Sequence, residues 1–155
     1  MLLDDFRRHA ECLHRMSSDF VEAIPEERWD FTPDEGGKFG SFARQVRHVV
    51  RVRGVYNDAL VEGRVDWSRS REHSLGSLTR EELLAGLHEQ QARLLTALDS
   101  VDTEAAIDWG GTSFSFEKFT WEFVQHEAIH HGQWSVYAQL AGFETPSSWQ
   151  QSWKL

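Results

Sequence analysis

The sequence is poor in cysteine and in long apolar segments. Its single cysteine, Cys12, excludes an internal disulfide and a cluster of thiolates around zinc. No stretch approaches the ~18 uninterrupted apolar residues of a membrane-spanning helix, and the N-terminus has no apolar run of signal-peptide length. We therefore expect a cytoplasmic protein without a membrane partner. Any metal ion in it would be held by histidine and carboxylate side chains.

Basic side chains are also scarce, with 16 Lys and Arg against 25 Asp and Glu and a formal net charge of −9. Proteins that bind nucleic acid use Lys and Arg to neutralise phosphates, so the acidic excess argues against nucleic acid as the main partner. The hydrophobic fraction of 40% and the presence of only three prolines fit a packed globular chain. At 155 residues, the length predicts a single domain over residues 1–155.

Four segments have apolar residues at alternating spacings of three and four, which is typical of a helix with one buried face. The first helix should end before Pro25, and the second should run from Ser41 to about Leu60. A capping box of Thr79 and Glu82 is expected at the start of the third. The fourth should begin at Ser115 and end at Gly142. The segment 63–77 reads as irregular and long enough to cross a bundle, residues 112–116 fit a short strand or the approach to a helix, and the Trp-rich end should fold back. The pattern predicts an all-α four-helix bundle.

Two histidines interrupt the apolar face of the fourth helix. His126 and His130 are four residues apart, so both side chains leave the same face and can reach one ion. Phe123 and Tyr137 lie on that face, together with the amide of Gln133. Buried polar groups need partners, and two imidazoles at this spacing favour a metal site over core histidines satisfied by hydrogen bonds.

A zinc-like ion needs a third ligand, and His48 is the best candidate because it lies within an apolar surface of the second helix. His131 is turned about 100° away from His130 and should not share the ion. Of the remaining histidines, we expect His88 to be a reserve ligand and the other three to lie on the surface: His9, His14 and His73. Arg44, Arg47 and Arg51 form a basic stripe, interpreted as a solvated face or, as the alternative, an anion-recognition surface.

The segment from His126 to His130 also matches the His-Glu-x-x-His pattern of zinc proteases, in which the glutamate, here Glu127, activates water. The extended form of that pattern places glycine and histidine where this chain has Gln133 and Val136. A zinc protease therefore remains only the less favoured alternative.

The segments FARQVRHVV, which contains His48, and HEAIHHGQWSVYAQLAG together resemble the DinB/YfiT-like family of metal-binding four-helix bundles. The resemblance implies up-down-down-up topology with a long crossover between helices two and three, often a homodimer, and zinc or nickel on His48, His126 and His130. Its characterised members include transferases that use low-molecular-weight thiols and a thiol-dependent maleylpyruvate isomerase. In one departure, His131 stands where many relatives have arginine.

Three neutral histidine ligands leave an ion with its full charge and an open position, as in catalytic sites. The resulting hypothesis is a metal-dependent enzyme of thiol S-transferase or hydrolase type. The ion would lower the pKa of a bound thiol or water, and the anion would attack a small electrophilic molecule. Glu127 and Gln133 are the candidates for orienting ligand or solvent. The alternative from another class is a bundle that binds metal or ligand without chemistry.

Overall fold

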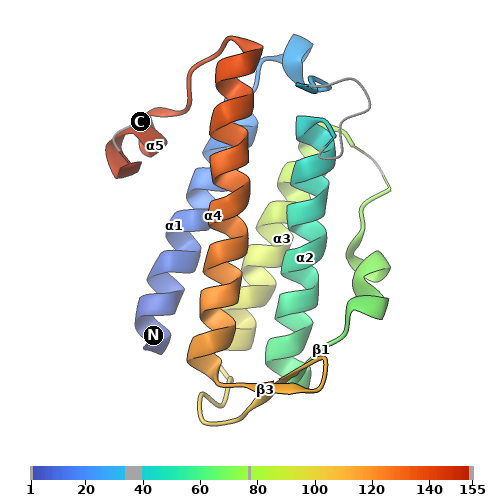
Figure 1. The fold of residues 1–155 in the computed structure, drawn as a ribbon, viewed down its shortest axis with the longest axis vertical. Coiled ribbons are helices and arrows are strands. Elements are labelled where there is room, and N and C mark those ends of the chain that lie inside the picture. Colours follow the sequence, from blue (N-terminus) through green and yellow to red (C-terminus); the bar gives the residue numbers. More distant parts are fainter. Residues whose placement is uncertain (1, 34–39, 77, 154–155) are drawn as a thin grey trace.

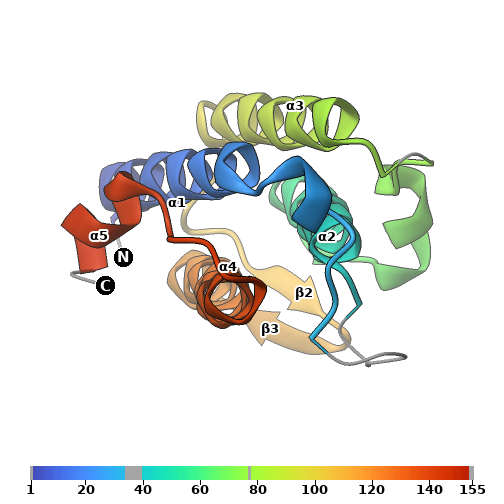
Figure 2. The same cartoon turned by 90° about the horizontal axis from the view of Figure 1, so that it is seen from above.

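The computed structural model describes residues 2–33, 40–76 and 78–153, and it is built mainly of helices. The four long ones are α1 (Leu3–Ala23), α2 (Phe42–Glu62), α3 (Arg80–Leu98) and α4 (Phe116–Ala141). They lie side by side, with α1 and α4 running upward and α2 and α3 downward in Figure 1. Seen from above (Figure 2), α3 packs against α1 and α2, and α4 lies across from it against the same two helices. Within the described ranges, no helix has the length and apolar character needed to cross a membrane.

Three of the long helices, α2, α3 and α4, begin at the capping residues that the sequence predicts. Ser41 accepts a hydrogen bond from the backbone N–H of Arg44, and Ser115 accepts one from that of Lys118. Thr79 caps α3 in the same way. Such side chains satisfy N–H groups that have no partner inside the helix, which fixes where each helix starts.

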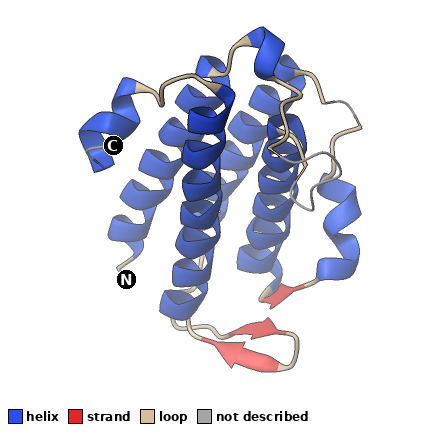
Figure 3. Ribbon diagram, turned by 45° about the horizontal axis from the view of Figure 1, so that its top comes forward, coloured by secondary structure: helices blue, strands red, loops and turns tan. Residues whose placement is uncertain are grey.

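A small sheet closes one end of the helices (Figure 3), with strands β1 (Arg64–Val65), β2 (Ile107–Trp109) and β3 (Thr112–Phe114) in that order. β1 is parallel to β2, and β2 is antiparallel to β3 across a turn at Gly110 and Gly111, where φ is 59° and 90°. The sequence predicted at most β3. The prediction of an irregular 63–77 segment was wrong in part, because it contains β1 and the 3-10 helix η2 (Trp67–His73). Strands this short have too little alternation to be detected.

The C-terminal segment folds back on the helices, as predicted. It forms the short helix α5 (Ser147–Trp153), which follows α4 and lies beside α1. Trp149 is fully buried, with its ring centroid 4.9 Å from that of Phe20. Its indole N–H donates to the backbone oxygen of Met16 over 2.8 Å. The contact buries a large aromatic ring and also satisfies its polar atom.

The apolar interior consists of two clusters, one toward each end of the helices. On α4 the buried residues of one cluster end at Phe123, and those of the other begin at Trp134. Val124, which is partly buried, packs against the first cluster. The segment between them contains the histidine motif, so that motif lies at the level where the two clusters meet. Leu140 continues the spacing of the histidine face of α4 and was expected to be buried, but it is 61% exposed, whereas Ala138 and Ala141 of the same turn are buried.

The 3-10 helix η2 packs closely on α2 at Gly54. A Cβ added to Gly54 would lie 2.2 Å from Cγ of His73 and 2.6 Å from its Cβ. His73 itself is held by Asp58, with Nε2 to Oδ2 at 2.7 Å, and its side chain is only 10% exposed. The prediction of a surface position for His73 was therefore wrong.

Replacing Gly54 with alanine is expected to lower the free energy of unfolding by about 1–3 kcal/mol, since η2 must shift to admit the methyl group. Gly132→Ala is the matched control. This glycine is also inside a helix, but its added Cβ would meet nothing within 4 Å, so alanine should stabilise by about 0.5–1 kcal/mol. Urea unfolding followed by circular dichroism measures both. Equal midpoints for the two variants would contradict the close packing at Gly54.

Candidate metal centre

The structure brings together the three histidines that the sequence singled out. His48 projects from α2, and His126 and His130 project from α4, which packs beside it. Nε2 of His48 lies 3.2 Å from Nε2 of His126. The ring centroid of His130 is 4.9 Å from that of His48 and 4.6 Å from that of His126. One nitrogen of each ring lies within 4.8 Å of the other two, a spacing that allows all three to bind one ion.

This histidine triad fits a divalent ion of the zinc type. Zinc binds imidazole nitrogens at ~2.0–2.1 Å with tetrahedral geometry, so two such nitrogens lie about 3.3 Å apart. The separation of 3.2 Å between Nε2 of His48 and Nε2 of His126 is close to that value. Three imidazoles suit zinc or nickel better than magnesium or calcium, which prefer oxygen ligands.

The triad is held in the neutral state that binds metals. Burial is the largest cause of a lowered pKa at all three rings, and the pKa of His48 and of His126 is about 4. At His48, the neighbouring His130 and Arg51 contribute to this lowering. At neutral pH a proton therefore competes little with an ion for these nitrogens.

Arg51 contacts the triad from its outer side, with Nη2 3.2 Å from Nδ1 of His48. A guanidinium only donates hydrogen bonds, so Nδ1 of His48 accepts and the ring proton lies on Nε2, facing His126. Binding an ion through Nε2 requires the proton on Nδ1 instead. Arg51 then loses its acceptor, so occupation of the triad and the position of Arg51 are coupled.

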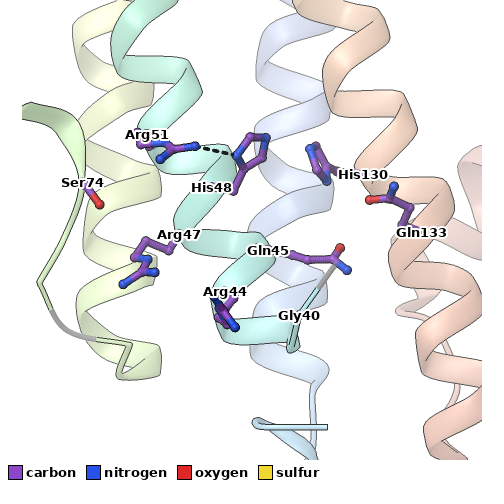
Figure 4. Close-up of a pocket in the computed structure, with 9 residues that line it drawn as sticks. All are labelled: Gly40, Arg44, Gln45, Arg47, His48, Arg51, Ser74, His130 and Gln133. Carbon is purple, nitrogen blue, oxygen red and sulfur yellow. Dashed lines mark hydrogen bonds between the residues drawn. The ribbon is translucent and has the colours of Figure 1, made fainter. Parts of the chain in front are cut away.

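A cavity of about 470 Å³ opens beside the triad, between α2, α4 and the segment that follows η2. In Figure 4, His48 and His130 face each other across the gap between the two helices, with Gln133 next to His130. The cavity is lined by Gly40, Arg44, Gln45, Arg47, His48, Arg51, Ser74, His130 and Gln133. Gln133, predicted to orient a ligand, therefore faces the cavity and also hydrogen-bonds His130.

Glu127, the other residue predicted to orient a ligand, faces away from the cavity. It is 1% exposed, and both carboxylate oxygens bind Arg53, at 2.9 Å from Nε and 2.7 Å from Nη2. The glutamate of a zinc protease must reach the water that it activates. A carboxylate fully engaged by Arg53 does not, which argues against the protease hypothesis.

The ion pair of Arg53 and Glu127 belongs to a buried polar network that sequence reasoning missed. Ser17 of α1 lies 3.2 Å from Arg53 and 2.8 Å from Nε2 of His131, a ring that is completely buried. His14 lies 3.2 Å from Arg53. The prediction of a surface position for His14 was therefore wrong, because its ring is partly covered and hydrogen-bonded.

One signal in the sequence could have revealed this network. Arg53 fills the gap between Val49 and Tyr56 in the apolar stripe of α2, and Ser17 stands within the stripe of α1. His88, predicted as a reserve ligand, lies 3.1 Å from His14 rather than in the triad. His131 is likewise outside the triad, as its angular position predicted.

Acid should destabilise the metal-free protein through this network. Burial, followed by the charge of Arg53, lowers the pKa of His14 to about 4. Burial alone would raise the pKa of Glu127, but the charge and hydrogen bonds of Arg53 hold it below its ordinary value. Between about pH 6.5 and 4 the unfolded chain binds more protons at His14 than the folded chain, so stability falls as pH falls. Glu127 adds to this loss below its ordinary pKa of 4.5.

Urea unfolding from pH 7 to pH 4 measures this dependence. A fully buried group changes the free energy by about 1.4 kcal/mol per unit of pKa shift, and the half-covered His14 contributes less. We expect a continuous decrease in stability, with a smaller slope between pH 6.5 and 4 in His14→Gln. A free energy of unfolding that is constant over this range would contradict the buried network.

Fold and site together define a helical protein with a three-histidine candidate metal centre between two of its helices. Residues 10–134 match the model of the DinB superfamily, and the chain belongs to that superfamily. This confirms the resemblance found in the sequence.

Solved structures agree in fold. The crystal structure of the DinB-like protein YjoA of Bacillus subtilis is 15% identical, with a TM-score of 0.72 over 92% of this chain and 94% of that one. A candidate member of the DinB family from Exiguobacterium sibiricum is 20% identical, with a TM-score of 0.64 over 91% and 92% of the two chains. A search of curated proteins found no match. At these identities the structural likeness supports a shared fold and nothing about the reaction.

Proposed function

We propose that the protein is a divalent-metal-dependent enzyme of thiol S-transferase or hydrolase type that acts on a small electrophilic molecule. The observation that supports this most directly is the convergence of His48, His126 and His130 beside an open cavity of about 470 Å³. Zinc or nickel is the expected ion, and a low-molecular-weight thiol is the expected second substrate. The proposal includes an up-down-down-up four-helix bundle, a homodimer and a cytoplasmic location, as expected from the sequence and the family resemblance.

When bound, the ion would supply a positive charge that lowers the pKa of a thiol or water molecule. The chain itself contributes the rest. Burial keeps the three imidazoles neutral, and the cavity admits a small molecule to the side of the triad formed by His48 and His130. The amide of Gln133 can donate and accept hydrogen bonds at the cavity wall, which suits it to orient a substrate.

The buried ion pair serves the triad indirectly. Arg53 is on α2, five residues after His48, and Glu127 is on α4, next to His126. Their paired hydrogen bonds fix the two helices relative to each other at the level of the triad. Catalytic groups lose much of their effect when misplaced by about 1 Å, so a rigid frame of this kind supports a catalytic rather than an adaptable site.

The direct test is an assay of purified protein loaded with zinc or nickel against a panel of low-molecular-weight thiols and model electrophiles. The informative variant is His126→Ala. Its matched control is His9→Ala, which removes an exposed histidine whose Nδ1 lies 2.9 Å from the backbone oxygen of Asp5. Turnover in the wild type and the control, and its loss in His126→Ala, would support the proposal. Bound metal with no turnover on any pair would favour the alternative of a non-enzymatic metal- or ligand-binding bundle.

A further inference from the structure

Three arginines line the cavity next to the triad. Arg44, Arg47 and Arg51 follow one another along α2, and all three contribute to the cavity wall together with His48. From Arg44 to Arg51 the helix rises by about 10 Å. The basic groups therefore extend from the beginning of the helix to the edge of the triad.

The described residues around this cavity wall supply no counter-charge to the three arginines. Within the part of the chain that the structure describes, the cavity lining contains no carboxylate, and none of the three arginines forms an ion pair. The chain as a whole has a net charge of −9. Positive charge is therefore concentrated in the cavity of a protein that is acidic as a whole.

The positions of the three arginines on α2 are also electrostatically unfavourable. Arg44 lies in the first turn of α2, where the helix dipole disfavours positive charge. Arg47 follows it by three residues and Arg51 follows Arg47 by four, so like charges are neighbours on the helix surface. Each placement opposes stability, and a ligand that neutralises the charges would relieve it.

Arg51 is the arginine that occupation of the triad would leave without its partner. Among the described residues, Arg51 hydrogen-bonds Nδ1 of His48, and its buried Nε has no acceptor there. When His48 binds an ion through Nε2, Nδ1 becomes a donor and Arg51 needs another acceptor. A carboxylate in the cavity would provide one.

We propose that the cavity binds a small anionic substrate with two or more carboxylate groups, which Arg44, Arg47 and Arg51 hold along α2 beside the triad. This inference rests on the proposed function, because it takes the triad as the centre where the substrate reacts. A cavity of about 470 Å³ accommodates a compact metabolite-sized molecule. Arginine suits this role because its planar group binds carboxylates through paired hydrogen bonds. Ser74 and Gln133 offer neutral hydrogen-bonding groups on the opposite walls.

The test uses glutarate, a flexible dicarboxylate, as the probe and glutaramide as its neutral counterpart. Calorimetry on protein freed of metal, with the chelator removed and the ionic strength fixed, measures binding without any contribution from an ion. We expect saturable glutarate binding at millimolar concentrations and none of glutaramide. Arg47→Gln should weaken glutarate binding by roughly tenfold or more, as expected for loss of a charged hydrogen bond.

The matched control is Arg15→Gln, which removes the same charge from an exposed position on α1 and should leave glutarate affinity unchanged. A second measurement, thermal unfolding without ligand, separates binding from a structural role. Arg44→Gln and Arg47→Gln should keep or raise the midpoint, because each removes a repulsive charge. Equal binding of glutarate and glutaramide, unchanged affinity in Arg47→Gln, or lower midpoints in both variants would overturn the proposal. Because these measurements need no metal, they are independent of whether the triad binds one.

Discussion

Replacing Arg53 with methionine is expected to lower the free energy of unfolding by about 3–5 kcal/mol, among the largest effects of a single substitution in this chain. The side chains of Arg53 and Glu127 are each 2% exposed, and their closest contact is 2.7 Å. Removing the arginine leaves the carboxylate of Glu127 buried without its counter-charge. Hydrogen bonds to Ser17 and His14 are lost at the same time.

Two further variants make this expectation specific. Arg8→Met removes an arginine whose side chain is 69% exposed and which pairs with Asp5 on the surface. It should cost no more than about 1 kcal/mol. The double variant Arg53→Met with Glu127→Leu removes both charges and should recover part of the loss. Urea unfolding of the four proteins provides the comparison, and a cost for Arg53→Met no greater than that for Arg8→Met would show that the buried pair does not stabilise the fold.

Removing one histidine of the triad is expected to weaken zinc binding by more than roughly 100-fold. Loss of a residue that only hydrogen-bonds a metal ligand already costs roughly 10–100-fold in affinity, and loss of a ligand should cost more. His48→Ala is the most informative substitution, because His48 comes from α2 whereas the HExxH motif lies entirely on α4. Affinity can be measured by competition with a chromophoric chelator.

The matched control is His88→Ala. The sequence offered His88 as a reserve ligand, but the structure pairs it with His14 at 3.1 Å, away from the triad. Zinc affinity should therefore be unchanged in His88→Ala. Retained affinity in His48→Ala together with a loss in His88→Ala would place the ion elsewhere and remove the basis of the proposed function.

Much of the helical framework and the composition of the triad could be predicted because both follow from local rules. Ser41, Thr79 and Ser115 satisfy backbone N–H groups at helix starts, a requirement that is visible in the sequence. The spacing of His126 and His130 fixes their common face through the helix repeat alone.

The surroundings of Glu127 and His131 could not be predicted in this way. The helix repeat gives the direction of each side chain around α4 but not which helix it meets. Because α4 packs against both α1 and α2, its buried arc is wider than one stripe. Glu127 and His131, each turned about 100° from the stripe, therefore enter the interior, where Arg53 and Ser17 meet them. Their partners lie 74 to 114 residues away in sequence.

The basic stripe shows a related limit. Three arginines at helical spacing are compatible with a solvated face and with an anion site. The sequence does not reveal that the segment after η2 and the histidine face of α4 enclose that stripe. The structure supplies this information by placing Ser74 and Gln133 on the walls of the same cavity.

The most direct test of the histidine triad as the metal centre is anomalous diffraction at the zinc absorption edge from crystals of the zinc-loaded protein. We expect one strong peak between His48, His126 and His130, with nitrogen ligands at ~2.0–2.1 Å. Soaking the same crystals with nickel and collecting at its edge tests whether the centre accepts either ion. A map with peaks only at surface carboxylates, and none among the three rings, would contradict the account.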